Sequence, residues 1–246
     1  MRRMTLLRAG CAALSALSVL ALAPNAFADW PYNASLGGVT LSTHLVNQYA
    51  PCVTSDGAGG WIFAWEEGSP GSTDIYVQRL SAQGVPLWGA NGVPVCTQAA
   101  AQTEPRIIRS GSGEAIVVWK DDRNGSSDIY VQRLGASGTR QWNLNGLAVC
   151  LAAGDQDSHV LVDDGSSGAV IAWRDARTAE TDIYAQRILF NGVAAWTVNG
   201  IGICTAPKDQ SEPALLATGS GLFYLAWSDR RNDLTSGVDL YCQRID

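Results

Sequence analysis

The sequence predicts an all-β fold, a β-propeller built from four blades of about 54 residues with four short strands each. The first observation is a repeat, since four tryptophans follow one another at intervals of 54 residues: Trp65, Trp119, Trp173 and Trp227. The second is the motif Asp-Ile-Tyr-x-Gln-Arg, which begins at Asp74, Asp128 and Asp182 and returns with changes at Asp239. The third is the lack of helical periodicity after residue 28. Repeated all-strand units of this size are typical of propeller blades.

The second repeat illustrates the strands expected in each blade. Residues 106–110 form a first strand before a Gly-Ser-Gly turn, and the apolar, β-branched run 115–119 forms a second strand covered on both faces. Residues 128–134 form a third strand after a polar loop. A fourth segment follows, which carries Trp142 and an Asn-Gly turn at 145–146. The tryptophans that end the second strands are expected in the core.

The first 28 residues have the features of a secretory signal peptide. Arg2 and Arg3 precede an uncharged, largely apolar stretch from Ala12 to Ala23, and Ala26-Phe27-Ala28 offers a cleavage site. The stretch is too short for a comfortable membrane span. We therefore expect a secreted or periplasmic protein that begins near residue 29 and does not span the membrane.

Residues 29–246 are expected to form one propeller domain. Its repeats are 38–91, 92–145, 146–199 and 200–246. The last repeat ends after a third strand, while residues 38–43 match the end of a fourth strand such as 92–97. The N-terminus is therefore predicted to complete the last blade and close the ring, which would remove exposed strand edges and leave a monomer. The alternative is an incomplete ring that pairs with a second chain as a dimer.

Composition excludes several classes of function. The chain is 46% hydrophobic and 16% charged, which argues against intrinsic disorder. Its net charge of −6 and its two lysines make nucleic acid an unfavourable partner. We expect no cofactor, although the oxygen-rich loop from Asp121 to Asp128 would suit Ca²⁺.

The five cysteines after residue 28 offer one candidate disulfide. Cys96, Cys150 and Cys204 share one repeat position and are expected as small buried residues. Cys52 and Cys242 break the pattern near the two ends of the domain, so a disulfide between the terminal blades is the candidate pairing.

The string from Ala115 to Arg123, followed by Asp128-Ile129-Tyr130, resembles the TolB-type, WD-like propeller repeat. It is similar also to tandem repeats of secreted bacterial surface proteins. The resemblance covers residues 38–246 and implies a propeller that acts as an interaction surface. The units are longer than TolB-type blades, because each carries an added segment around Trp88, Trp142 or Trp196.

A recurring polar set supplies the candidate binding residues. Its aspartate–arginine pairs are Asp121 with Arg123, Asp175 with Arg177, and Asp229 with Arg231. These pairs either fix the loop between the second and third strands, as bidentate guanidinium–carboxylate pairs can, or form a ring of ligand sites. The second tryptophan set, Trp88, Trp142 and Trp196, is expected to be partly exposed and could stack on sugars.

The function expected from these features is a non-catalytic recognition module that binds carbohydrate or a cell-surface protein through repeated loops. A structural or assembly protein is the alternative. A glycoside hydrolase is the least favoured class, because catalysis needs carboxylates in unlike environments. Only a loose set of acids breaks the repeat: Glu66, Glu67, Glu104, Asp155, Asp157, Asp209 and Glu212. His159 takes a position held by proline in the other repeats and is expected at the surface.

Overall fold

The computed structural model describes residues 38–219 and 221–246. The predicted signal peptide, residues 1–28, lies outside the described part of the chain. Within that part, no helix is long and apolar enough to cross a membrane.

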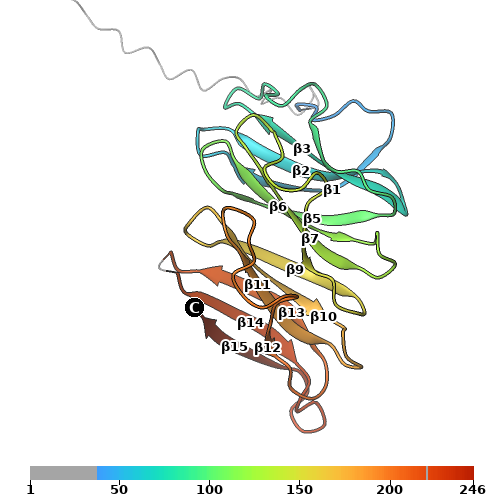
Figure 1. Ribbon diagram of the computed structural model, residues 1–246, viewed down its shortest axis with the longest axis vertical. Coiled ribbons are helices and arrows are strands. Elements are labelled where there is room, and N and C mark those ends of the chain that lie inside the picture. The colour runs from blue at the N-terminus through green and yellow to red at the C-terminus, as the bar shows by residue number, and fades with distance from the viewer. Residues whose placement is uncertain (1–37, 220) are drawn as a thin grey trace, which may run out of the picture.

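Among the described residues, fifteen strands form four antiparallel sheets, and each sheet is one blade, so the predicted four-blade propeller fold is confirmed (Figure 1). The inner strands are β1 (Asn47–Ser55), β5 (Gln102–Arg109), β9 (Gln156–Asp163) and β13 (Gln210–Ala217). The second strands are β2 (Trp61–Ser69), β6 (Ala115–Asp121), β10 (Ala169–Asp175) and β14 (Phe223–Asp229). The third strands are β3 (Ser72–Leu80), β7 (Asp128–Leu134), β11 (Asp182–Ile188) and β15 (Asp239–Ile245). The fourth strands are β4 (Val93–Cys96), β8 (Leu147–Cys150) and β12 (Ile201–Cys204).

The fourth blade has only three strands among the described residues, in the order β13-β14-β15. Residues 38–43, expected to form its missing strand, are not in a strand and instead contact the first blade. The blades follow one another along the long axis of the molecule, with the first and last at opposite ends (Figure 1). The prediction that the N-terminus closes the ring is therefore wrong for the described chain. The prediction rests on the match between residues 38–43 and the end of a fourth strand. This match does not determine the angle between neighbouring blades.

Three clusters of apolar side chains bind the blades together, and each cluster draws on two successive blades. Trp119 and Trp173 are completely buried and Trp65 and Trp227 nearly so, which confirms the first tryptophan set as core. A glycine directly before each described fourth strand leaves room for the tryptophan of the second strand in the same blade. A Cβ added to Gly200, whose φ is +82°, would lie 2.5 Å from the Trp173 ring.

Every inner strand carries a β-bulge near its start. At each bulge a non-glycine residue has a positive φ: Ala50, Glu104, Ser158 and Glu212. Such backbone is strained for these residue types, and bulges redirect side chains beside functional sites. The four bulges therefore lie at equivalent positions near the start of the inner strands.

Candidate functional site

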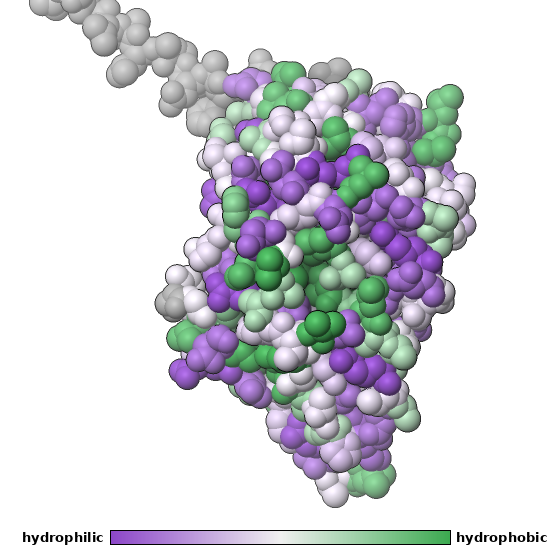
Figure 2. Space-filling view, in the orientation of Figure 1, coloured by the Kyte–Doolittle hydropathy of each residue, from purple (hydrophilic) through white to green (hydrophobic). Residues whose placement is uncertain are grey.

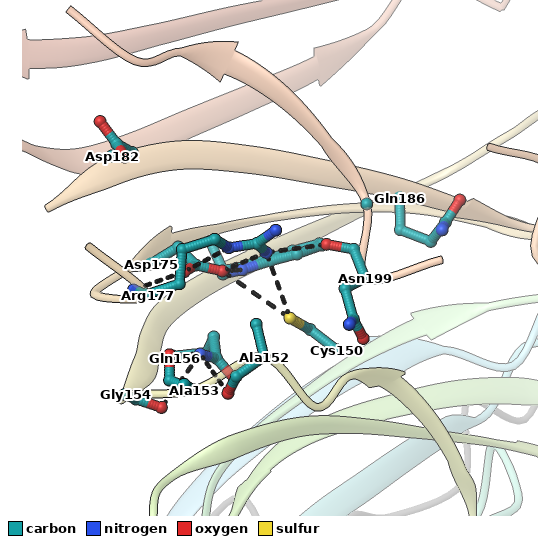
Figure 3. Close-up of polar contacts among 12 residues, drawn as sticks. Cys150, Ala152, Ala153, Gly154, Gln156, Asp175, Arg177, Asp182, Gln186 and Asn199 are labelled. Atoms are coloured by element: carbon teal, nitrogen blue, oxygen red, sulfur yellow. Dashed lines mark hydrogen bonds and ion pairs between the residues drawn. The ribbon is translucent and has the colours of Figure 1, made fainter. Parts of the chain in front are cut away.

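The repeated aspartate–arginine pairs form buried clusters. In the third blade, Arg177 donates from Nε to Asp175 Oδ1 at 2.8 Å and from a terminal nitrogen to Oδ2 at 2.6 Å (Figure 3). Trp173 Nε1 donates to the same Oδ2 at 2.8 Å. The guanidinium also lies 3.6 Å from the centre of the Tyr184 ring. Both carboxylate oxygens are therefore used inside the protein.

The arrangement repeats at Asp121 with Arg123 and at Asp229 with Arg231, and all three aspartates are fully buried. Burial alone raises the pKa of Asp229, but hydrogen bonds from Arg231 and Trp227 outweigh it and hold that pKa well below its ordinary value. The structure thus places the predicted ligand-binding pairs where they fix the loop between the second and third strands.

The first blade builds the same cluster from different residues. Glu67 replaces the aspartate and accepts a hydrogen bond from Trp65 Nε1 at 3.1 Å. His44 takes the place of the arginine, because its ring nitrogen bonds Glu67 and its ring lies edge-on to Tyr76. Sequence comparison of the repeats missed His44, since it comes from the segment before β1. The one available signal was Glu67, which stands two residues after Trp65 as Asp121 does after Trp119.

The second tryptophan set joins neighbouring blades. Trp88 is 3% exposed, so its expected exposure is wrong, and its Nε1 donates to the Ala136 carbonyl of the next blade at 2.9 Å. Trp142 makes the same contact with the Phe190 carbonyl at 3.3 Å. Trp142 and Trp196 are half-buried, and both lie against interblade clusters. Packing between blades accounts for the added segment that carries these tryptophans.

Cys52 and Cys242 are both free cysteines, so the predicted disulfide between the terminal blades is not formed. Because the blades do not close into a ring, β1 and β15 lie in blades at opposite ends of the molecule (Figure 1). Cys96, Cys150 and Cys204 are buried, as expected. Within residues 38–219 and 221–246, no group of three or more His, Cys, Asp or Glu side chains could hold a metal ion. Calcium binding by the Asp121–Asp128 loop stays a prediction.

The inner strands line a groove of about 510 Å³. Its walls are mostly apolar, and residues from all four blades take part, among them Val53, Ile107, Leu161 and Leu215. Figure 2 shows hydrophobic side chains gathered across the middle of this face, over the inner strands. Arg106 is the one cationic residue among those that line the groove. A concave surface of this size and polarity is a typical ligand site.

Charged and polar side chains gather at the bulged end of the inner strands, which we call the groove rim: Glu66, Glu104, Lys120, Asp157, Arg174, Glu212 and Ser228. Lys120 pairs with Glu104 at 2.9 Å, and Arg174 binds both oxygens of Asp157 at 2.8 and 2.5 Å. Glu212 accepts a hydrogen bond from Ser228 at 2.9 Å. Burial raises the pKa of Asp157, but the bonds and charge of Arg174 outweigh it and hold the pKa below its usual range.

The rim lacks the repeat symmetry of the rest of the fold. Positions equivalent to Lys120 hold Glu66, Arg174 and Ser228, while those equivalent to Glu104 hold Ala50, Ser158 and Glu212. Asp157, Glu104, Glu66 and Glu212 belong to the set of acids that breaks the repeat. The sequence identified these residues one by one, and the structure brings them to one end of the inner strands.

His159 lies on β9, one residue after the bulge, and is only 2% exposed. The expectation of a surface position is therefore wrong. Burial lowers the pKa of His159 to about 4, and the charges of Glu104, Arg106 and Lys120 have smaller effects on it. The imidazole is thus neutral in the folded protein at neutral pH.

We expect His159→Pro to remove a pH-dependent loss of stability. The other bulges precede Pro51, Pro105 and Pro213 with the same positive φ, so proline fits the backbone here. The unfolded chain takes up a proton near pH 6.5 and the folded protein only near pH 4, so wild-type stability falls across this interval as the pH drops. The loss is up to about 3 kcal/mol. Denaturant unfolding at pH 7 and pH 4.5 checks this, and an equal loss in both proteins would refute it.

Comparison with known proteins supports the fold. No family model matches the sequence, and no curated protein matches it. An α-L-arabinanase from Penicillium chrysogenum, solved with arabinobiose, is similar in structure with a TM-score of 0.52 and 12% identity. The match covers 84% of this chain and 66% of that one. A protein of unknown function from Dyadobacter fermentans has a TM-score of 0.53 and 11% identity, with 84% and 68% covered.

An endo-arabinase from Bacteroides thetaiotaomicron also matches, with a TM-score of 0.44, 12% identity, and 81% and 75% covered. The fold thus defines a β-propeller, and the propeller part of the sequence resemblance is confirmed. The neighbour from Penicillium chrysogenum is an enzyme, an α-L-arabinanase. This finding corrects the expectation of a non-catalytic module that is not an enzyme. At these identities the likeness establishes the fold, so the activity is taken up as a proposal.

Proposed function

We propose that the protein is a glycoside hydrolase that cleaves a polysaccharide at the groove rim. One observation carries the proposal: the rim gathers carboxylates whose repeat equivalents differ in charge from blade to blade. Hydrolysis of a glycosidic bond needs two carboxyl groups in unlike environments, one protonated and one ionised. The buried aspartate–arginine clusters cannot supply them, because they are near-copies of one another with both oxygens occupied.

Asp157 is the carboxylate that stays ionised. Arg174 lowers its pKa, yet the Asp157 side chain remains 24% exposed and can face a substrate. Its negative charge would stabilise the positive charge that develops on the sugar ring in the transition state.

Glu212 is the proton donor in this proposal. Among the described residues it forms no ion pair, and its hydrogen-bond partner is the neutral Ser228 hydroxyl. The Glu212 carboxyl would give its proton to the glycosidic oxygen as the bond to the sugar breaks. A water molecule would form the new bond to the same sugar carbon and pass its proton to Asp157. Glu104, held by Lys120, would position the substrate from the second blade.

The groove favours a neutral, extended polysaccharide as substrate. Its apolar walls run along four inner strands and can cover the C–H faces of successive sugar rings. The arabinobiose in the structure of the Penicillium chrysogenum neighbour makes arabinan the first substrate to try. We propose also that residues 1–28 direct export, which brings the enzyme to extracellular polymers. We propose also that the repeat is related to the TolB-type propeller repeat that it resembles.

The proposal is tested by sugar release from a panel of neutral polysaccharides that includes arabinan. We expect the chain from residue 29 onward to release reducing sugar from at least one, and Glu212→Gln to lower that rate by about 100-fold or more with an unchanged melting temperature. Glu180→Gln is the control, because Glu180 is an exposed acid that belongs neither to the residues lining the groove nor to the groove rim. Absence of hydrolysis across the panel, or full activity in Glu212→Gln, would overturn the assignment.

A further inference from the structure

The outer face of the fourth blade exposes positions that every other blade buries. Tyr224 is 46% exposed and Leu240 is 84% exposed. Their equivalents in the first three blades are all fully buried in interblade clusters: Ile62, Ile116 and Val170 for Tyr224, and Ile75, Ile129 and Ile183 for Leu240. The described fourth blade thus presents one half of an interface that the chain forms three times internally.

The outer face of the first blade presents the other half. Trp61 is 43% exposed. Its equivalents Ala115, Ala169 and Phe223 are buried in clusters that include the preceding blade. A hollow of about 220 Å³ opens beside Trp65 on this blade and is lined by Leu41 and Tyr49.

Residues 38–43 lie on the first blade as the fourth strand of a preceding blade would. The backbone N–H of Thr43 donates to Asn91 Oδ1, and the same bond runs from Thr97 to Asn145 and from Leu151 to Asn199. Ser42 bonds Glu67 in the same way that Cys96 contacts Asp121 of the following blade. The segment therefore occupies the position of a fourth strand, although no described sheet pairs with it.

We propose that a second copy of this chain packs its first blade on the fourth blade, and that its residues 38–43 pair with β15. The partner is a second copy because each face is the missing half of the other in the repeated interblade interface. This inference is independent of the proposed activity. Since the contact is head-to-tail, it closes into a ring of copies when the rotation allows.

The repeat specifies contacts in this interface. Within the chain, Gln156 N donates to the Ser127 carbonyl and Gln210 N to the Thr181 carbonyl, each at 2.7 Å across a blade boundary. The equivalent bond in the assembly joins Gln48 of one copy to Val238 of the other. Likewise Ile129 lies opposite Cys150, and Ile183 opposite Cys204, in the pairing of third and fourth strands. Leu240 is therefore placed opposite Ser42 of the second copy.

The test is the mass of the full chain in solution, measured by light scattering at micromolar concentration. We expect a dimer or larger closed assembly for the wild type and monomers for Leu240→Asp and Tyr224→Arg. Both side chains are exposed in the single chain, so the variants should keep the wild-type circular dichroism. Val198→Asp is the matched control, because Val198 is 86% exposed but lies outside both faces.

Thiol labelling supplies a second readout. Cys242 is exposed in the single chain, and its equivalents Val77, Val131 and Ala185 are buried between blades. We expect Cys242 to be protected in the wild type and labelled rapidly in Leu240→Asp, with Cys242→Ser to identify the site. A monomeric wild type, or rapid labelling of wild-type Cys242, would overturn the proposal even if a variant failed to fold.

Discussion

Replacing Asp157 with asparagine is expected to lower kcat on the cleaved polysaccharide about 1,000-fold or more, because the amide cannot supply the negative charge that stabilises the transition state. The asparagine side chain keeps the shape of the aspartate and one bond to Arg174. The pair lies at a half-exposed position, so the free energy of unfolding should change by less than about 1 kcal/mol. Steady-state kinetics and denaturant unfolding measure the two effects separately.

Asp163→Asn is the matched control for this variant. Asp163 is an exposed aspartate at the other end of the same strand, β9, and it caps the Gly165 backbone N–H. We expect wild-type kinetics from it. Wild-type kcat in Asp157→Asn, or an equal loss in Asp163→Asn, would contradict the role given to Asp157.

The second large effect concerns stability. Asp175→Ala is expected to lower the free energy of unfolding by about 3–5 kcal/mol, because it leaves the Arg177 charge and the Trp173 N–H without their buried acceptor. Urea unfolding followed by tryptophan fluorescence measures the change.

The double variant Asp175→Ala/Arg177→Ala separates the ion pair from the rest of the cluster. We expect it to lose less stability than the sum of the two single variants, because removing both partners leaves no unpaired charge. A loss below about 1 kcal/mol in Asp175→Ala would show that the cluster does not hold the loop.

Much of the blade structure could be predicted from the sequence because repetition averages out local ambiguity. The second and third strands around Trp119 and Asp128 lie close to their expected places, and the burial of the first tryptophan set followed from its apolar neighbours. The fourth strand was less well placed. It begins at Leu147, after Trp142 and the Asn-Gly turn, which belong to the connection before it.

Features that depend on contacts between blades could not be predicted from one repeat at a time. Trp88 is buried by a carbonyl and a glycine turn of the next blade, and His159 is buried beside charged residues of the preceding blade. Ring closure depends on the angle between blades, on which the strand pattern carries no information. The rim acids could be identified from the sequence as breaks in the repeat. Their common location could not be predicted, because it depends on the β-bulges of the inner strands.

The most direct test of the central claim is a crystal structure of Asp157→Asn with an oligosaccharide of the cleaved polymer. The account predicts sugar in the groove of the inner strands, with a glycosidic oxygen within hydrogen-bond distance of the Glu212 carboxyl. Sugar bound only against the half-buried rings of Trp142 and Trp196, away from the rim, would contradict it.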